Sequence, residues 1–358
     1  MKEKITFLGI ETSCDETAAA VIRENENGTA DILSNVVLSQ IDEHKKFGGV
    51  VPELAARSHL ENIEFIVDKS LKDAKISLDK IDGVAATAGP GLIVCLTVGL
   101  NIGKSIAAFA EKPFVGVNHL EGHALSPGLE NKIQFPYLLL LISGGHTQYL
   151  IVKNINQYEQ LGTTIDDELG EASDKVSKSL NNVYPGGPVV ERMAQKSNLN
   201  NIKFPRPLIN SGDLNFSFSG LKTAVRREIN KSKPLDNQMA YNICAEFQDS
   251  VIDVILSKLS LAIRLFKNKY DIQNPSVVLA GGVAANKKIF SSIKKVSEGE
   301  KFNISVAPHH LCTDNAAMIA WSGIERLRKE IKSTPIVIKP RWPLDIQNDV
   351  KSEVDIKV

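Results

Sequence analysis

The sequence has few cysteines, and they are scattered. Among its 358 residues there are four, Cys14, Cys95, Cys244 and Cys312, none of them in C-x-x-C spacing. This excludes a disulfide framework and a zinc ribbon, and it favours a reducing compartment. We expect the four thiols to be small buried hydrophobic side chains.

Long apolar runs and net charge are also missing. No stretch reaches the roughly 18 apolar residues of a membrane span, and a strand is predicted close to Met1, so we expect neither a membrane helix nor a signal peptide. The expected location is the cytoplasm, with an organellar matrix as the alternative. Lys plus Arg equals Asp plus Glu at 42 each, so a polyanionic partner needs a local basic patch.

The apolar pattern is repeated along the chain. Residues 5–22 and 137–152 share one plan, in which an apolar strand leads through a short polar turn into a second apolar strand. Residues 84–109 and 277–296 share another, in which a strand leads through a glycine-rich turn into a helix. Strands alternating with helices of this length predict an α/β fold. Further helices are predicted near 59–73, 167–180, 221–229, 238–266 and 314–329.

This repetition predicts two α/β lobes built on one plan. We place the N-terminal lobe at 1–130 and the C-terminal lobe at 131–322. The remaining residues, 323–358, are predicted to be the end of a helix and an extended tail that can pack back on the first lobe. Residues 196–215, which contain Pro205, Pro207 and several asparagines, are predicted to be an exposed connection.

Two histidines four residues apart, His119 and His123, follow a helix-start signal in V-N-H-L-E-G-H. On a helix, residues i and i+4 project from nearly the same side, so both imidazoles can reach one ion. Asn118 is a good N-cap, and Glu121 is predicted to complete a capping box. Taken alone, the pair fits a solvated helical turn about as well as a metal site.

A third ligand is needed, because two imidazoles bind a divalent ion poorly. The segment 307–315 follows a predicted strand and is expected to open a helix with Thr313 as N-cap. Two histidines with one carboxylate leave coordination positions open, which fits iron(II) or catalytic zinc better than a closed structural site. We expect one divalent metal per subunit, iron(II) favoured and zinc possible. The segment offers Asp314, His309, His310 and Cys312.

A zinc peptidase is disfavoured by the spacing. In H-E-x-x-H the general base follows the first ligand directly, whereas here Leu120 follows it and Glu121 comes second. Glu121 projects far from His119 around the helix, so it is better placed to cap than to activate water.

Other turns offer groups for a ligand. Asp15 and Glu16, in the turn of the first repeat, suit a metal, a water or an amine, although an ordinary polar hairpin explains them equally well. The glycine-rich turn at 280–286 can approach a nucleotide closely, but it lacks the spacing of a P-loop or a dinucleotide motif. The backbone of the rigid loop 184–188 can also lie close to a ligand.

Nine motifs in order carry a resemblance to a known family. They are G-I-E-T-S-C-D-E-T, G-G-V-V-P-E-L-A-A-R-S-H, N-H-L-E-G-H, S-G-G-H-T-Q, D-D-x-L-G-E, Y-P-G-G-P, F-S-F-S-G-L-K-T, A-G-G-V-A-A-N and C-T-D-N, and they run from Gly9 to Asn315. On these motifs the chain resembles the bacterial and organellar tRNA N6-adenosine threonylcarbamoyltransferases, a family once described as glycoprotein endopeptidases.

The resemblance implies a fold of the actin, sugar-kinase and heat-shock ATPase type, with a nucleotide cleft between two duplicated lobes. It implies transfer of the threonylcarbamoyl group of threonylcarbamoyl-AMP to the N6 amine of the adenosine just 3′ of the anticodon, in tRNAs that read codons beginning with A. AMP is released. The implied protein partners are a smaller paralogous subunit and a P-loop ATPase, and no membrane is involved.

Residue by residue, the resemblance makes His119, His123 and Asp314 the metal ligands. From their placement we predict that Asp15 or Glu16 orients the attacking amine or takes its proton. For tRNA, the best basic cluster is on one predicted helix, with a solvated helical face as the alternative. The alternatives in other classes are an actin-like kinase or ATPase and a non-catalytic nucleotide-binding scaffold. The residues implied to contact the adenylate are Leu141, Ile142, Ser143, Gly144, Gly145, Asp174, Gly187 and Asn286, and the basic cluster is Lys222, Arg226 and Arg227.

Overall fold

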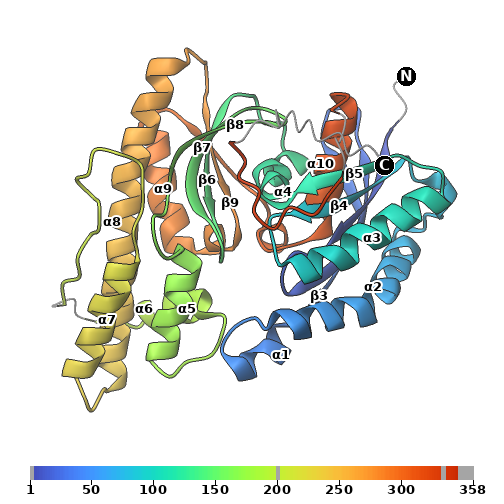
Figure 1. Cartoon of the computed structure of the whole chain (residues 1–358). Helices are drawn as coiled ribbons and strands as arrows, with labels where there is room; N and C mark the ends of the chain where they lie inside the picture. Colours follow the sequence, from blue (N-terminus) through green and yellow to red (C-terminus); the bar gives the residue numbers. More distant parts are fainter. Residues whose placement is uncertain (1–3, 199–201, 332–335, 346–358) are drawn as a thin grey trace, which may run out of the picture.

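Two mixed β-sheets, each covered by helices, form the framework of the protein (Figure 1). The structure is a computed structural model that describes residues 4–198, 202–331 and 336–345. The first sheet has the order β3-β2-β1-β4-β5 and the second β10-β9-β6-β7-β8. The strands are β1 (Thr6–Glu11), β2 (Glu16–Glu24), β3 (Ala30–Ser39), β4 (Gly83–Gly89), β5 (Phe114–Asn118), β6 (Tyr137–Ile142), β7 (Thr147–Asn154), β8 (Gln157–Thr163), β9 (Ser276–Ala280) and β10 (Asn303–Val306).

The two sheets have the same topology. In each, the first strand in sequence pairs antiparallel with the second and parallel with the fourth. The fifth strand then pairs parallel with the fourth at the sheet edge. The predicted duplication is confirmed, and the fold is that of the actin and sugar-kinase type.

The central strands are apolar because they are covered on both faces. All residues of β1 and of β6 are buried. A strand between two layers of helices has no solvent face, so it reads as a continuous apolar run instead of an alternating one. This is why both strands could be predicted from sequence to within a residue.

The predicted helices differ from the observed ones mainly at their first residues. The helix Gly186–Ala194 was not predicted, and the first three of its residues belong to the loop predicted at 184–188. The helix predicted near 59–73 begins at Pro52, since proline is well accommodated in the first helical turn. The helix predicted at the end of 277–296 begins at Lys287, after a short 3₁₀ turn. The helices are α1 (Ile41–His44), α2 (Pro52–Ala74), α3 (Ile93–Phe109), α4 (His119–Leu125), α5 (Leu169–Ser179), α6 (Gly186–Ala194), α7 (Ser219–Lys231), α8 (Asn237–Lys269), α9 (Lys287–Gly299) and α10 (Ala316–Arg328).

The start of α10 corrects one prediction. The N-cap is Asn315, whose Oδ1 accepts the Met318 N–H at 3.0 Å, and not Thr313. Asn and Thr can both cap a helix, and here the backbone becomes helical only after residue 315. Asp314 therefore lies in the loop before the helix, where its side chain can turn toward the cavity.

Helix α10 follows the last strand of the second sheet but packs on the first. It contacts β1, β2, β4 and β5. The approach is close at Gly9, where a Cβ would lie 2.3 Å from the Ala316 carbonyl oxygen and 2.7 Å from the Ala320 nitrogen. Only glycine fits this contact. We therefore propose that α10 is counted with the first lobe, not divided at residue 322.

The described part of the tail, residues 336–345, has no helix or strand and lies against the first lobe. Lys339 N–H donates to the Ala88 carbonyl at 2.8 Å, and Asn118 Nδ2 donates to the Trp342 carbonyl at 2.9 Å. Residues 332–335 and 346–358 lie outside the described residues, so the predicted extended tail can be compared with the structure only over residues 336–345.

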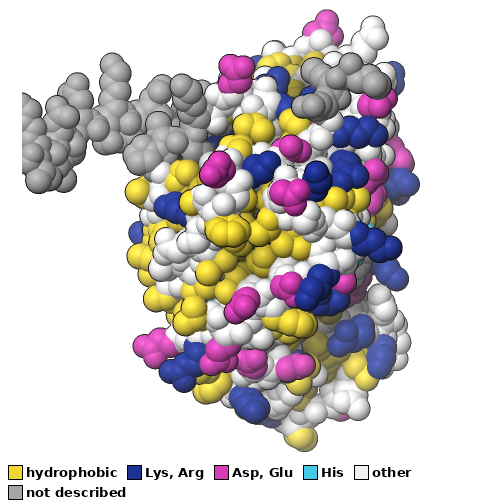
Figure 2. All heavy atoms as spheres, turned by 90° about the vertical axis from the view of Figure 1, so that its right-hand side faces the viewer, with side chains coloured by type: hydrophobic (Ala, Val, Ile, Leu, Met, Phe, Trp, Pro, Cys, Tyr) yellow, Lys and Arg dark blue, Asp and Glu magenta, His cyan; other side chains and the backbone are white. Residues whose placement is uncertain are grey.

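One face of the molecule carries an apolar area. Figure 2 shows the side that lies at the right of Figure 1, where hydrophobic side chains gather and charged ones surround them. The large exposed hydrophobic residues of α2 and α3 are Leu60, Phe65, Ile93, Val94 and Phe109. Such areas are typical of protein contacts. Across the described ranges, we find no helix with the length and hydrophobicity to span a bilayer.

Candidate functional site

A cavity of about 1210 Å³ lies where the two repeats meet. It is lined by the segments that follow β1, β4 and β5 in the first sheet and β6, β9 and β10 in the second. Ligands of α/β proteins bind at the carboxyl ends of parallel strands, because the loops there converge. The duplication therefore explains why sequence-distant motifs share one cavity.

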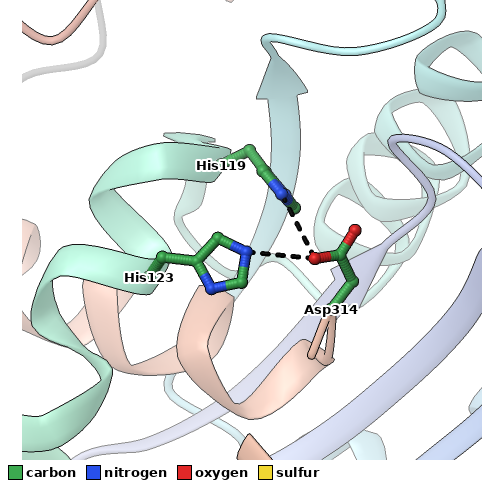
Figure 3. A group of neighbouring side chains, drawn as sticks. All are labelled: His119, His123 and Asp314. Atoms are coloured by element: carbon green, nitrogen blue, oxygen red, sulfur yellow. Dashed lines mark hydrogen bonds and ion pairs between the residues drawn. The ribbon is translucent and has the colours of Figure 1, made fainter. Parts of the chain in front are cut away.

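The two histidines and the aspartate meet at this cavity (Figure 3). The Asn118 side chain accepts the Leu120 N–H at 2.9 Å, which confirms the predicted N-cap. This cap fixes the start of α4, and from there both imidazoles project toward the loop before α10. His123 Nε2 lies 3.0 Å and His119 Nε2 3.4 Å from the same oxygen, Asp314 Oδ1. One ligand atom from each side chain lies within 4.8 Å of the others.

A fourth residue, Glu11, orients His119. Glu11 is fully buried at the end of β1, and its Oε2 lies 3.0 Å from His119 Nδ1. Thr87 Oγ1 donates to the same carboxylate oxygen at 2.5 Å. A carboxylate behind a metal-binding imidazole sets the tautomer and the ring orientation. Sequence reasoning missed Glu11, although a carboxylate ending an otherwise apolar strand was a usable signal.

The buried charges at this cluster depend on one another. Burial would raise the pKa of Glu11, but the charge of His119 outweighs it and the pKa is lowered. Burial would lower the pKa of His119, but Asp314 and Glu11 hold it well above its ordinary value. Two carboxylates facing one imidazole give the cluster an excess of negative charge, which suits a cation.

The donor set fits a divalent metal ion. It consists of two imidazole nitrogens and one carboxylate oxygen, and it lies on one side of an open cavity. Such a set leaves coordination positions for a substrate. His123 Nδ1 is buried without a hydrogen-bond partner in the described structure, so that ring is held by packing and by its Nε2 contact.

Of the four candidates in segment 307–315, Asp314 joins the histidines. Cys312 is buried and its thiol contacts the Ala307 carbonyl at 3.2 Å, and His310 is exposed. The side chain of His309 is not among those described. Cys95 and Cys244 are also buried and all four thiols are free, as predicted, although Cys14 is only partly buried.

Glu121 does not complete a capping box. Its carboxylate accepts from Arg326 Nε at 2.9 Å and from Arg326 Nη2 at 2.7 Å, and both side chains are buried. The capping prediction was wrong because α10 packs across α4 and brings an arginine 205 positions away against this carboxylate. Glu121 is absent from the described cavity lining, which is consistent with the argument against a peptidase.

The acidic turn of the first repeat also faces the cavity. Cys14, Asp15 and Glu16 all line it. Burial, with the nearby charges of Asp314 and Asp15, raises the pKa of Glu16 well above its ordinary value. A carboxyl group with a raised pKa holds its proton more tightly than an exposed glutamate does.

Most residues implied to contact the adenylate lie around the same cavity, and two do not. Leu141 and Ile142 point into hydrophobic clusters on opposite faces of the second sheet. His146, which sequence reasoning missed, lines the cavity, and burial lowers its pKa to about 4. The lining members of the predicted set are Ser143, Gly144, Gly145, Asp174, Gly187 and Asn286.

Comparison with known proteins identifies the family. Residues 31–321 match the family model described as tRNA N6-adenosine threonylcarbamoyltransferase. The chain belongs to this family. The resemblance predicted from nine motifs is thereby confirmed.

Curated relatives in the tRNA N6-adenosine threonylcarbamoyltransferase family match almost throughout. The protein of that name from Rhizobium leguminosarum bv. trifolii is 49% identical over 345 residues, which cover 95% of this chain and 94% of the relative. Its counterpart from Brucella suis is 53% identical over 340 residues, which cover 94% of this chain and 95% of the relative. Among solved structures, HypF from T. kodakarensis superposes with a TM-score of 0.58 at 14% identity, over 91% of this chain and 48% of that one, which shows the fold alone.

The pH dependence of stability is expected to report on Asp174, which accepts the Gly186 N–H at 2.5 Å. Burial raises its pKa from 3.8 to about 6. The folded state therefore holds this proton more tightly than the unfolded state, and the stabilising contribution is lost as pH rises from 3.8 through about 6. Asp174→Asn should remove this contribution to the pH dependence.

Denaturant unfolding at several pH values measures the contribution of Asp174 to the free energy of unfolding. The free energy of unfolding of Asp174→Asn relative to the original protein should increase between about pH 4 and about pH 7, the window that proton linkage gives for this carboxyl group. A difference that stays constant over that range would contradict the assignment.

Proposed function

We propose that the chain transfers the threonylcarbamoyl group of threonylcarbamoyl-AMP to the N6 amine of the adenosine just 3′ of the anticodon, releasing AMP. The observation that supports this most directly is the convergence of His119, His123 and Asp314 on the cavity that both repeats line. An actin-like kinase or ATPase does not need two imidazoles there. Membership of the family supplies the reaction and the tRNA substrate.

His119, His123 and Asp314 would hold the metal. Two histidines and one carboxylate with open positions are the ligand set typical of non-haem iron(II), so iron(II) is favoured, and zinc is possible because it accepts the same donors. A bound ion would act as a Lewis acid toward the phosphate or carbamoyl oxygens of the adenylate. Glu11 Oε2 contacts His119 Nδ1, which leaves His119 Nε2 as the nitrogen that would bind the metal.

The turn after β6 and the turn after β9 would hold the nucleotide. Ser143 N–H donates to the His146 carbonyl at 2.8 Å and Gly145 N–H to Ser143 Oγ at 3.3 Å, so both stiffen the turn. We therefore assign the close nucleotide contact in this turn to Gly144. Asn286 accepts from Gln248 Nε2 at 3.0 Å and caps α9, which fixes it at the cavity wall.

Asp15 and Glu16 would act on the attacking amine. They stand on the opposite repeat from the nucleotide turns, across the cavity. Replacing both with alanine should lower the transfer rate about 100-fold, the usual contribution of a positioned acid or base, without loss of bound metal. If each single alanine variant and the double variant transfer at the original rate, the assignment is wrong.

The test of the function is direct. The chain is incubated with tRNA, threonylcarbamoyl-AMP, iron(II) and the smaller paralogous subunit and P-loop ATPase that we propose as partners, and the digested nucleosides are examined by mass spectrometry. Threonylcarbamoyladenosine is expected. Loss of added ATP without modified nucleoside would favour the kinase-like alternative, and neither product would favour the scaffold. We place the reaction in the cytoplasm or an organellar matrix, where tRNA is modified.

The structure changes the prediction about tRNA contacts. Lys222 forms an ion pair with Asp167, and none of Lys222, Arg226 and Arg227 belongs to the described cavity lining. Four other lysines do line it, and three of them are exposed. Lys45 forms an ion pair with Asp42, which leaves Lys46, before α2, and Lys178, on α5, as the candidates. They stand on opposite repeats at the rim, where a polyanion entering the cavity would meet them.

Reversing the charge of the two rim lysines should therefore weaken tRNA binding more than reversing Arg226 and Arg227. Removal of one phosphate contact should flatten the dependence of log affinity on log salt by about 0.7 to 0.9. Binding is measured by titration of tRNA at several salt concentrations. If the two double variants weaken tRNA binding equally, Arg226 and Arg227 on α7 also contact tRNA. If the rim variant binds tRNA as the original protein does, the two rim lysines are not part of the binding surface.

A further inference from the structure

A buried hydrogen-bonded network lies behind the acidic turn and takes no part in the scheme above. It joins Thr17 of β2, Gln40 after β3, His44 of α1 and His59 of α2. At most 1% of each of these residues is exposed. Two neutral histidines in such a place are costly unless each nitrogen has a partner, and here each has one.

The hydrogen-bond partners of His44 and His59 determine which ring nitrogens carry a proton. Val51 N–H can only donate, so His44 Nδ1 accepts it at 3.3 Å and His44 Nε2–H donates to Gln40 Oε1 at 3.2 Å. The Cys14 carbonyl can only accept, so His59 Nε2–H donates to it at 3.0 Å. Both rings therefore carry a proton on Nε2.

The remaining nitrogen of the second ring closes the chain of bonds. His59 Nδ1 accepts the Thr17 hydroxyl at 2.7 Å, and that hydroxyl oxygen accepts Gln40 Nε2–H at 3.4 Å. Burial lowers the pKa of His59, which agrees with a neutral ring. The direction of donation runs without a break from Val51 to the Cys14 carbonyl.

Three successive carbonyls of the acidic turn are each held by a different segment. The Ser13 carbonyl accepts Leu92 N–H at 2.9 Å, and the Asp15 carbonyl accepts Gln40 N–H at 2.9 Å. Between them, the Cys14 carbonyl is held by the His59 ring. The peptide between Cys14 and Asp15 thus depends on one side chain, and its orientation sets where the Asp15 side chain points.

The other end of the network reaches the rim of the cavity. Residues 45–50, between His44 and Val51, line the cavity. Within this segment Gly48 has φ +71°, and a Cβ there would lie 2.8 Å from Lys178 Nζ on the opposite repeat. The segment is therefore in contact with the second repeat and, through His44 and Gln40, with His59.

We propose that His59 is a positioning residue for the acidic turn, holding the Cys14 carbonyl so that Asp15 and Glu16 face the attacking amine, and that Gln40 and His44 couple this turn to residues 45–50 at the rim. The proposal rests on the proposed function, because the transfer reaction is its readout. It differs from a packing role in requiring a donor at the position of the His59 Nε2 atom.

Two polar replacements of His59 separate these roles. In His59→Gln the amide nitrogen can take the place of Nε2 and donate to the Cys14 carbonyl, whereas in His59→Asn the amide is too short to reach it. Ser70→Ala is the matched control, because Ser70 is also buried on α2 and bonds to Ser34 Oγ at 2.8 Å, away from the cavity. The full chain with its partners is assayed for kcat, KM for threonylcarbamoyl-AMP, bound iron and the unfolding midpoint.

We expect His59→Asn to lower kcat about 10-fold to 100-fold, as small misplacements of reacting groups do, with KM and bound iron unchanged. His59→Gln should retain kcat within about 3-fold, and Ser70→Ala should retain it fully. If His59→Asn does not fold, Thr17→Val, which removes the hydroxyl donor to Nδ1, should lower kcat and Thr17→Ser should restore it.

Two results would overturn the proposal. One is equal kcat in the asparagine and glutamine variants, or in Thr17→Val and Thr17→Ser. The other is a fall in kcat for Ser70→Ala that matches the His59→Asn variant, which would make the effect one of general stability. Absence of transfer by the unaltered protein would instead count against the proposed function.

Discussion

His119→Ala should yield a folded protein that holds little iron or zinc and transfers about 1000-fold more slowly, by analogy with the loss of electrostatic stabilisation at other active sites. The variant keeps His123 and Asp314, but two ligands bind a divalent ion weakly. It also leaves the buried Glu11 carboxylate without its imidazole. Metal content by elemental analysis and the initial rate of threonylcarbamoyladenosine formation measure both effects.

The matched control for this variant is His310→Ala. His310 precedes Asp314 in the same segment but is exposed, and it is not part of the three-residue group. This variant should bind metal and transfer at the original levels. Unchanged metal content in His119→Ala would exclude the proposed site, and equal losses in both variants would point to damage of the whole segment.

Glu121→Gln should lower the free energy of unfolding by about 3 to 5 kcal/mol, because it leaves the buried Arg326 guanidinium without its carboxylate. The pair is bidentate, with donor to acceptor distances of 2.9 and 2.7 Å, and side-chain exposure of 4% for Arg326 and 1% for Glu121. It joins α10 to α4, the helix that carries both histidines of the proposed metal site. We therefore expect weaker metal binding as well as lower stability.

Two comparisons test that explanation. The double variant Glu121→Leu with Arg326→Met should be more stable than either single variant, since it removes both buried charges instead of stranding one. Asp68→Asn, which breaks an exposed pair with Lys72, should cost less than about 1 kcal/mol. Denaturant unfolding measures all of these. If Glu121→Gln costs no more than Asp68→Asn, the pair does not stabilise the fold.

The repeated plan and the position of helix α4, which carries His119 and His123, could be predicted from sequence because their signals are local. Buried strands such as β1 and β6 are continuous apolar runs, and Asn118 caps α4 through a contact two residues away. Helix starts were less predictable. Thr313 and Asn315 are both acceptable caps, and the choice between them depends on how α10 meets the first sheet.

The partners of single side chains could not be predicted in the same way. Glu121 has the spacing of a capping residue, yet α10 supplies Arg326 to it. Lys222 has the spacing of a basic patch, yet Asp167 neutralises it. Leu141 and Ile142 belong to a functional motif, yet a strand between two layers of helices buries their side chains.

By itself, the sequence determined the duplicated α/β architecture and the family, and it selected His119, His123 and Asp314 as the metal ligands we propose, since these follow from hydrophobic period, local capping and ordered motifs. Only the tertiary structure decided that Glu11 orients His119 and that His59 holds the Cys14 carbonyl. The first contact joins residues that are 108 positions apart in the sequence, and the second joins residues that are 45 positions apart. Such pairings are set by the way two sheets and their helices pack, and packing distance has no local signature in a chain.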